Sequence, residues 1–226
     1  MDYGTTRARV ETYFDRTATK TWERLTSDAP VSRIRETVRA GRERMRDLML
    51  SRLPDDLRGA RILDAGCGPG MATIELAKRG ATVVAADISP QLIDIAQLRL
   101  PHDLQKQVKF HAGDMLDPKL GTFDAVIAMD SLIYYTAPDI GDALAALEPR
   151  VSGPIVFTVA PRTPALMAMW YAGKAFPRSD RSPVMIPHAH TKLAKAAKSA
   201  GVRRMLRPVD RITSGFYISE AMELRP

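Results

Sequence analysis

The chain has 226 residues, a length that suits one α/β domain with a substantial core and leaves too little for two. Its hydrophobic content of 45% and charged content of 26% are ordinary for a globular protein, and no stretch is apolar for long enough to span a bilayer. The single cysteine, Cys67, excludes an internal disulfide and fits a reducing compartment, so the composition favours a cytoplasmic protein without a secretory signal.

The net charge of +7 is distributed unevenly along the chain. Residues 61–160 carry eight Lys or Arg against twelve Asp or Glu, a net of −4. Residues 161–212 carry eleven against two, a net of +9. This asymmetry favours an anionic partner for the later segment, whether a carboxylated substrate, anionic lipid headgroups or nucleic acid.

The first predicted element is a long helix over residues 28–53. Its apolar positions recur at three- and four-residue spacing and form one stripe, made of Val31, Ile34, Val38, Gly41, Met45 and Leu48. Six arginines lie mostly off that stripe: Arg33, Arg35, Arg39, Arg42, Arg44 and Arg46.

Residues 60–160 alternate between strands and helices. Five strands are predicted, over 61–66, 82–87, 108–114, 123–130 and 154–161. Three helices are predicted among them, over 71–80, 89–101 and 138–150, the second with Ser89 as its N-cap. This order predicts a parallel sheet with helices on both faces, in which ligands bind at the carboxyl ends of the strands.

The last third begins with an apolar, methionine-rich stretch over residues 164–176 and a loop rich in proline and arginine over 177–187. A lysine-faced helix follows over 191–201, and strands over 202–209 and 215–224 complete a mostly parallel sheet of seven strands. The four histidines stand singly or two apart, so we predict no metal site.

Three glycines follow the first predicted strand in "RILDAGCGPGM", residues 61–71. A strand, alternate glycines and a helix make a tight turn that lets a ligand approach the backbone. Asp87 ends the next strand, 21 residues after Gly66, where an acid can accept hydrogen bonds from ribose hydroxyls. The pattern predicts a nucleoside-containing cofactor, and a tight packing turn is the alternative.

The dinucleotide fingerprint needs a glycine at position 71, where this chain has Met71, and the phosphate-binding Gly-Lys-Ser/Thr motif is absent. What remains resembles the S-adenosylmethionine loop of class I methyltransferases. That resemblance implies that Asp64 faces the methionine end of the cofactor, Asp87 the ribose and Asp114 the adenine amine. The cofactor-binding residues it implies are Asp64, Gly66, Gly68, Gly70, Asp87, Ile88, Asp114, Met115 and Asp130. Each aspartate has an alternative role as a helix cap or turn residue.

Two kinds of nucleic-acid methyltransferase are disfavoured by missing residues. Enzymes that act on exocyclic amines of bases carry Asn/Asp-Pro-Pro-aromatic after strand four, where this chain reads "MDSL" at residues 129–132. Cytosine C5 chemistry needs a cysteine beyond strand four, and Cys67 lies in the first loop. We therefore predict no nucleic-acid partner.

Longer segments resemble the magnesium-protoporphyrin O-methyltransferase family. They include "YFDRTA" (13–18), "SDAPVSRIRETVRAGR" (27–42), "MDSLIYY" (129–135), "FTVAPRTPAL" (157–166), "FPRSDRSP" (176–183) and "SGFYISEAMEL" (214–224). The family transfers a methyl group from S-adenosylmethionine to one propionate of a magnesium porphyrin in (bacterio)chlorophyll synthesis. The resemblance implies a Rossmann-like class I methyltransferase fold for residues 1–226. Its expected parts are an N-terminal helical lid (1–58), a cofactor-binding core (59–160), an insertion after strand five (161–190) and the last helix and strands (191–226).

A large flat porphyrin needs an apolar slot, and its second propionate needs a cation. The predicted apolar contacts are Met167, Met169, Trp170 and Phe176, and the predicted cations are Arg162, Arg178 and Arg181. Each of these residues has ordinary core or solvated surface as its alternative role.

The chain departs from plant and cyanobacterial family members at two positions. Tyr134 stands where those members have a histidine that is thought to help catalysis, and Thr26 stands where they have a tyrosine. A tyrosine with a pKa of about 10 is a poor base, so we predict that Tyr134 orients the substrate. Asp130, Tyr135 and Tyr13 are further candidates in the same region.

Two other functions remain open at this stage: methylation of a quinone or another small molecule, and porphyrin binding or delivery without catalysis. The family resemblance also implies contact with the large subunit of magnesium chelatase and loose association with photosynthetic membranes.

Overall fold

The structure is a computed structural model that describes residues 3–13, 33–174 and 185–226. Its strands are β1 (Arg61–Ala65), β2 (Thr82–Asp87), β3 (Val108–Ala112), β4 (Ala125–Ala128), β5 (Ile155–Pro161), β6 (Pro187–His188), β7 (Met205–Ser214) and β8 (Tyr217–Arg225). Its α-helices are α1 (Tyr3–Tyr13), α3 (Arg33–Leu50), α4 (Met71–Lys78), α5 (Pro90–Arg99), α6 (Ala137–Leu147), α7 (Pro164–Lys174) and α8 (His190–Ser199). Within these ranges no helix is both long and apolar enough to cross a bilayer.

The sheet has the strand order β3-β2-β1-β4-β5-β8-β7. The five strands from β3 to β5 run parallel, whereas β8 pairs antiparallel with both β5 and β7. The predicted mostly parallel sheet of seven strands is therefore confirmed. One addition is β6, a two-residue strand that pairs with the end of β5 and that the sequence analysis left within a loop.

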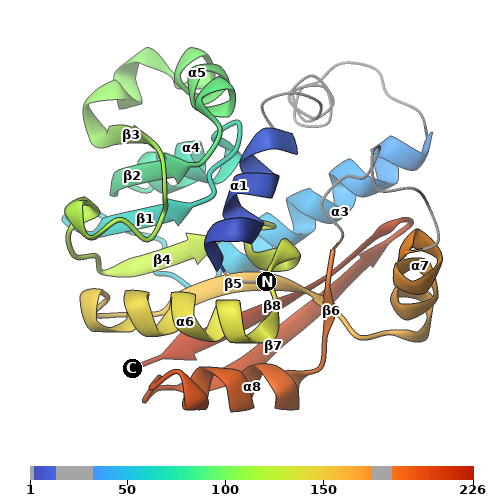
Figure 1. Ribbon diagram of the computed structural model, residues 1–226. Helices are drawn as coiled ribbons and strands as arrows, with labels where there is room; N and C mark the ends of the chain where they lie inside the picture. The colour runs from blue at the N-terminus through green and yellow to red at the C-terminus, as the bar shows by residue number, and fades with distance from the viewer. Residues whose placement is uncertain (1–2, 14–32, 175–184) are drawn as a thin grey trace.

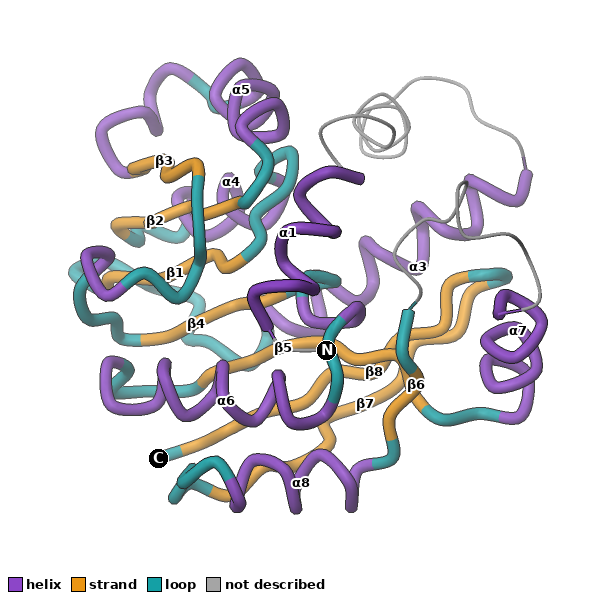
Figure 2. The backbone as a smooth tube through the Cα atoms, in the orientation of Figure 1, coloured by secondary structure: helices purple, strands orange, loops and turns teal. Residues whose placement is uncertain are grey.

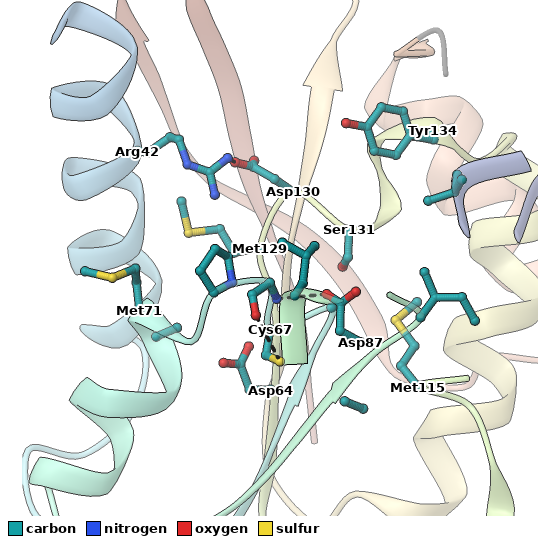
Figure 3. A pocket seen from close by; sticks show the side chains of 18 of the residues that line it. Arg42, Asp64, Cys67, Met71, Asp87, Met115, Met129, Asp130, Ser131 and Tyr134 are labelled. Atoms are coloured by element: carbon teal, nitrogen blue, oxygen red, sulfur yellow. Dashed lines mark hydrogen bonds and ion pairs between the residues drawn. The ribbon is translucent and has the colours of Figure 1, made fainter. Parts of the chain in front are cut away.

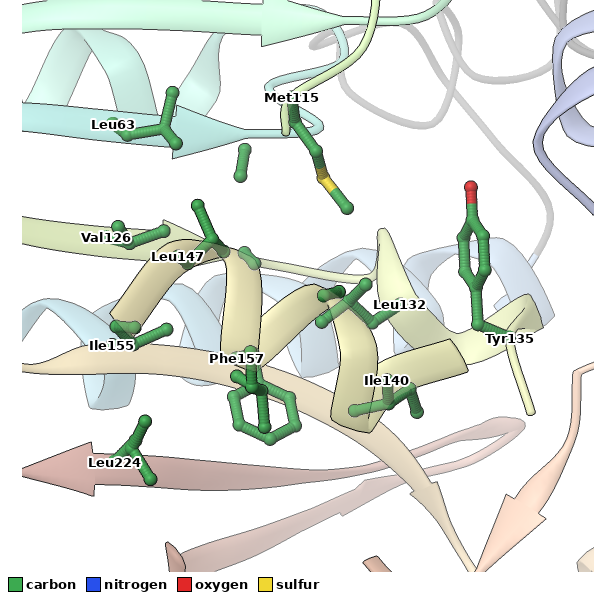
Figure 4. Packing of buried hydrophobic residues seen from close by; sticks show 14 of the residues in the cluster. Leu63, Met115, Val126, Leu132, Tyr135, Ile140, Leu147, Ile155, Phe157 and Leu224 are labelled. Carbon is green, nitrogen blue, oxygen red and sulfur yellow. The ribbon is translucent and has the colours of Figure 1, made fainter. Parts of the chain in front are cut away.

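Alternating strand residues build a separate core on each face of the sheet. Leu63, Val126 and Phe157 point to one face, where Figure 4 shows strand residues packed against Ile140 and Leu147 of α6. Ile62 and Val156 belong to the core of the other face, which α3 and α4 cover. Figure 2 shows the resulting three layers, with α6 and α8 on one side of the sheet and α3 and α4 on the other.

The predicted helix boundaries agree with the structure to within a few residues. Ser89 caps α5 by accepting a hydrogen bond from the backbone N–H of Leu92, as predicted. The long helix predicted over 28–53 is α3, which spans 33–50, and residues 28–32 lie outside the described part of the chain. Helix α7 was not predicted, and α1 falls within the helical lid expected over residues 1–58, although no separate helix was delimited there.

Helix α1 lies beside the carboxyl ends of the central strands, far in sequence from the residues it contacts (Figure 1). Its only buried side chains are Thr6 and Val10, and Val10 joins the core on the α6 side. With so narrow an apolar face, α1 gave no strong periodic signal in the sequence.

Candidate functional site

A pocket opens at the carboxyl ends of β1, β2 and β4, between those strands and the helices α1 and α3 (Figure 3). It brings together most of the residues predicted to bind the cofactor or to act in catalysis. The predicted residues that line it are Asp64, Gly66, Gly68, Asp87, Ile88, Asp114, Met115, Asp130, Tyr134 and Tyr135. Gly70 and Tyr13 do not line it.

The glycine loop forms the floor of this pocket. Gly66 has a φ of 79°, and a Cβ on it would lie 2.3 Å from the Cβ of Ser131. Only glycine allows this approach of the loop to the end of β4. Gly70, with a φ of 82°, is instead the N-cap residue of α4, so its place in the motif serves the turn into the helix.

Asp87 projects into the pocket from the end of β2. Its Oδ2 accepts a hydrogen bond from the Gly68 N–H at 2.8 Å, and its Oδ1 accepts one from the Ser89 N–H at 2.9 Å. Each carboxylate oxygen can accept a further bond, so the side chain is fixed and still suited to a ribose diol. The acceptor oxygens of Asp87 therefore fit the ribose of S-adenosylmethionine.

Asp64 lies deeper, at the end of β1, and is only 1% exposed. The Thr73 hydroxyl donates a hydrogen bond to its Oδ2 at 2.5 Å. Burial, with a smaller contribution from the charge of Asp87, raises the pKa of Asp64, the hydrogen bonds from Thr73 lower it, and the net result is a pKa of about 7. Asp64 therefore changes its charge close to neutral pH, and a cation bound beside it would favour the ionised form.

Asp114 anchors α1 to the rim of the pocket. Its Oδ1 accepts a hydrogen bond from the Tyr3 hydroxyl at 2.9 Å, and its Oδ2 accepts one from Arg7 Nη1 at 2.7 Å. The Tyr3 ring also stacks on that of Tyr135, with 4.9 Å between the centroids. The sequence analysis missed Tyr3 and Arg7, and no motif in the sequence points to them.

Asp130, at the end of β4, is the one non-glycine residue with a positive φ, 55°, in the described part of the chain. Its Oδ2 lies 2.5 Å from Arg42 Nη1 of α3. Hydroxyl groups of Thr158 and Tyr217 each donate a hydrogen bond to its Oδ1 at 3.2 Å. Strained backbone conformations concentrate at functional sites, and here four separate contacts, including the bond from the Asp130 N–H to Thr158 Oγ1, hold it.

Tyr134 lines the pocket next to this cluster and is 8% exposed. Burial raises the pKa of its phenol well above the ordinary value, and Asp130 adds to the shift while Arg42 opposes it. The hydroxyl therefore remains protonated at physiological pH and acts as a hydrogen-bond donor. Burial likewise raises the pKa of Tyr135, whose backbone carbonyl accepts a hydrogen bond from His188 Nε2 at 3.0 Å.

Three of the residues predicted to bind the substrate are described, Arg162, Met167 and Trp170, and none of them lines this pocket. Arg162 is exposed, and its backbone N–H donates to the His188 carbonyl at 2.9 Å. Met167 and Trp170 lie half-buried on α7, away from the pocket lining. Four other predictions, Thr26, Phe176, Arg178 and Arg181, lie outside the described residues, as does the side chain of Met169.

Arginines of the two N-terminal helices line the pocket instead: Arg7 of α1 and Arg39, Arg42 and Arg46 of α3. The sequence analysis placed the arginines of α3 off the apolar stripe but gave them no role. Their spacing of three, four and seven residues puts these three on one side of the helix, which is the signal that could have identified them. The pocket thus has an aspartate wall, formed by the ends of β1 and β2, and an arginine wall formed by α3, which also contributes Glu43. Figure 3 shows Arg42 of the arginine wall, with Asp64 and Asp87 of the aspartate wall.

Comparison with known proteins agrees with this arrangement. A model of the magnesium-protoporphyrin IX methyltransferase C-terminus matches residues 128–226, and a methyltransferase-domain model matches residues 62–151. The magnesium-protoporphyrin O-methyltransferase of Rhodobacter capsulatus is 62% identical over 226 residues, which cover 100% of this chain and 99% of that protein. The chain belongs to the magnesium-protoporphyrin O-methyltransferase family.

More distant members of the magnesium-protoporphyrin O-methyltransferase family are also similar. The chloroplastic magnesium protoporphyrin IX methyltransferase of Arabidopsis thaliana is 28% identical over 222 residues, covering 96% of this chain and 70% of its own length. The crystal structure of magnesium protoporphyrin IX methyltransferase from Synechocystis PCC 6803, with S-adenosylhomocysteine (SAH) bound, superposes with a TM-score of 0.83 and 26% identity. That match covers 97% of this chain and 100% of the other, so the Rossmann-like methyltransferase fold predicted from the sequence is confirmed.

Proposed function

We propose that this protein transfers a methyl group from S-adenosylmethionine to a propionate carboxylate of magnesium protoporphyrin IX, giving the monomethyl ester in (bacterio)chlorophyll biosynthesis. The observation that carries the proposal is the 62% identity to the Rhodobacter capsulatus magnesium-protoporphyrin O-methyltransferase over the whole chain. The pocket supports it, because its two walls suit a cationic methyl donor and an anionic acceptor.

The aspartate wall would hold the cofactor, which supplies a methyl group on a positively charged sulfur. Asp87 accepts hydrogen bonds from the ribose, and Ile88 and Met115 pack against the adenine. Asp64 faces the cationic end, where its ionised carboxylate stabilises the bound molecule. The Asp114 carboxylate accepts a hydrogen bond from the adenine amine, in addition to those that it already accepts from Tyr3 and Arg7.

The acceptor needs little acid–base help from the protein. A propionate has a pKa of about 4, so it is ionised at neutral pH and no proton is transferred when its oxygen bonds to the methyl carbon and the carbon–sulfur bond breaks. The protein must remove water from the carboxylate and align it, and good alignment contributes about 7–11 kcal/mol in favourable cases. The protonated Tyr134 would orient the carboxylate by donating a hydrogen bond.

Helix α1 would act as a lid on this pocket. It reaches the pocket through Tyr3, Arg7 and Val10, and its contacts with Asp114 and Tyr135 are side-chain interactions that can break and form again. Lid closure would exclude water from the reacting carboxylate. In this organisation residues 1–58 cover a cofactor-binding core at 59–160, and Met167 and Trp170 belong to the insertion after β5.

The experiment that tests the function is mass spectrometry of the products after incubation with S-adenosylmethionine and a panel of magnesium protoporphyrin IX, metal-free protoporphyrin and quinols. We expect the monomethyl ester of the magnesium porphyrin as the main product. Preferential methylation of a quinol would replace the proposal with its main alternative. Tight porphyrin binding without turnover at saturating cofactor would instead indicate a porphyrin-binding or delivery protein.

Peripheral association with a photosynthetic membrane, and contact with the large subunit of magnesium chelatase, complete the proposal. The net charge of +9 over residues 161–212 and the exposed Phe216 in the turn between β7 and β8 support a surface of this kind. Sedimentation with vesicles containing anionic lipid should show binding that weakens with salt, and purified chelatase large subunit should be retained by the tagged protein. If the protein binds neither the vesicles nor the chelatase subunit at low ionic strength, this part of the proposal is wrong.

A further inference from the structure

The arginine wall of the pocket has one member that is fixed at the reaction centre. Arg42 of α3 pairs with Asp130 at the end of β4, and its side chain is only 18% exposed. We propose that the Arg42 guanidinium, held in place by Asp130, binds the carboxylate group that receives the methyl group. This inference rests on the function proposed above and identifies a residue that the sequence analysis did not assign to the site.

The position of Asp130 is determined from several directions. Its own N–H donates to Thr158 Oγ1 at 2.7 Å, and the Tyr217 hydroxyl reaches its Oδ1 from β8. Fixing the carboxylate in this way also fixes the guanidinium that pairs with it. The residues come from α3, β4, β5 and β8, so the whole fold contributes to the placement of Arg42.

The ion pair between Arg42 and Asp130 reduces the repulsion that Asp130 alone would exert on the acceptor carboxylate. An ionised Asp130 alone would repel an incoming carboxylate, because like charges at close range disfavour each other. Pairing with Arg42 neutralises that charge. A guanidinium presents several N–H donors in a planar fork, so it can bind Asp130 and a second carboxylate at the same time.

The location within the pocket agrees with this role. Figure 3 shows Arg42, Asp130 and Tyr134 on one side of the pocket, and Asp64 and Asp87 on the other. The cofactor proposed for the aspartate side leaves the Arg42 side for the acceptor. Ser131 lies between them, and its buried hydroxyl has no hydrogen-bond partner, so a polar ligand group at this point would satisfy it.

The other cations near the pocket are less suited to the reacting group. Arg7 binds Asp114 at the adenine end, and Arg162 lies exposed outside the pocket. Arg39 and Arg46 lie one turn to either side of Arg42 on α3, and neither forms an ion pair with Asp130.

A binding experiment separates this proposal from a purely structural role. The probes are magnesium protoporphyrin IX, its monomethyl ester and its dimethyl ester, titrated by fluorescence into protein saturated with SAH. The variants are Arg42→Met and the control Arg44→Met, which removes the same charge from the exposed side of the same helix, where Arg44 donates to the Thr213 carbonyl. We expect wild type and Arg44→Met to bind the diacid more tightly than the monomethyl ester. In Arg42→Met that preference should fall by about tenfold, while affinity for the dimethyl ester changes little.

Three results would overturn the inference. Arg42→Met could keep the full preference for the diacid, or Arg44→Met could lose as much of it. Arg42→Met could also weaken the binding of S-adenosylmethionine in the absence of porphyrin while keeping the preference, which would make the cofactor's own carboxylate the partner of Arg42.

Arg42→Lys decides the case if Arg42→Met does not fold. A lysine keeps the charge next to Asp130 but lacks the planar fork, so it should lose part of the preference for the diacid, and a full wild-type preference would contradict the proposal. The activity of the wild-type protein distinguishes a failure of the proposed function from a failure of the role given to Arg42. If wild type forms no ester, the proposed function fails, whereas ester formation with an unchanged Arg42→Met fails only the assignment of Arg42.

Discussion

The Tyr134 hydroxyl is a buried donor at the acceptor side of the pocket, and its role is open to a direct test. Tyr134→Phe removes one hydrogen bond to an ionised carboxylate, which contributes about 1.5–3 kcal/mol, so kcat/KM for the magnesium porphyrin should fall about tenfold to a hundredfold. Because burial raises the pKa of this phenol, the pH profile of kcat should keep its shape between pH 6 and about 9. Steady-state kinetics of the variant provide both readings.

The matched control is Tyr171→Phe, which removes a phenol from the exposed side of α7 and should leave the kinetics unchanged. Full retention of kcat/KM by Tyr134→Phe would show that the tyrosine does not orient the acceptor. Loss of the low-pH limb of the profile, along which activity rises as a base is deprotonated, would show instead that Tyr134 acts as a base.

Asp64 makes the affinity for the cofactor depend on pH. Its pKa of about 7 in the folded protein means that acidification protonates it, and a protonated carboxyl no longer attracts the cationic end of S-adenosylmethionine. The dissociation constant should therefore rise below pH 7, by up to about tenfold for each pH unit, and remain level above pH 8. Isothermal titration calorimetry between pH 5.5 and about 8.5 measures this directly.

Asp64→Asn should flatten that pH dependence and weaken cofactor binding at pH 8 by about tenfold. The stability of the ligand-free protein should depend on pH in the opposite sense to its affinity for the cofactor. A carboxyl whose pKa is raised on folding stabilises the folded state at low pH, and this contribution is lost as the pH rises from about 4 to about 7. The Asp64→Asn variant should thus unfold at a higher temperature than wild type at pH 8. If its cofactor affinity depends on pH in the same way as that of wild type, the role given to Asp64 is wrong.

Helix α1 is the element whose attachment depends on few contacts. Arg7→Met removes the ion pair between Arg7 and Asp114. The side chains of these residues are 40% and 21% exposed, so the pair contributes at most about 1 kcal/mol. Hydrogen exchange of the α1 backbone amides should become about threefold faster, without a change in the exchange of the central strands. Arg9→Met, on the exposed side of the same helix, is the control.

The lid role makes a kinetic prediction for the same variant. Arg7→Met should raise the KM for S-adenosylmethionine while leaving the melting temperature nearly unchanged, because α1 contributes only Thr6 and Val10 to buried contacts. If α1 exchange is faster but KM and kcat both match wild type, the helix is attached to the pocket without serving it.

At the level of elements, the sequence predicted what local patterns determine. The strands from β1 to β5 and the helices between them carry strong periodicity, and Ser89 was predicted as the cap of α5. Helix α1 has too few apolar positions for such a pattern. Its placement depends on Tyr3 and Arg7 meeting Asp114, which lies more than a hundred residues away, and no local rule predicts that contact.

For the whole molecule, the mostly parallel sheet followed from the sequence, and so did the expectation of a cofactor site at the carboxyl ends of its strands, where the structure has a pocket. Asp87 was predicted from its spacing after the glycine loop, whereas Asp64 and Asp130 came from the resemblance to class I methyltransferases. On the acceptor side, the basic charge after residue 160 pointed to Arg162, whereas the arginines that line the pocket belong to α1 and α3, near the other end of the chain.

The whole account depends on the two walls of the pocket receiving opposite charges. The measurement that tests it most directly is a crystal structure of the protein with SAH and magnesium protoporphyrin IX. We predict the ribose on Asp87 and one propionate oxygen within hydrogen-bonding distance of Arg42, facing the sulfur atom. A porphyrin bound with both propionates away from α3, or SAH bound with its ribose away from Asp87, would contradict the account.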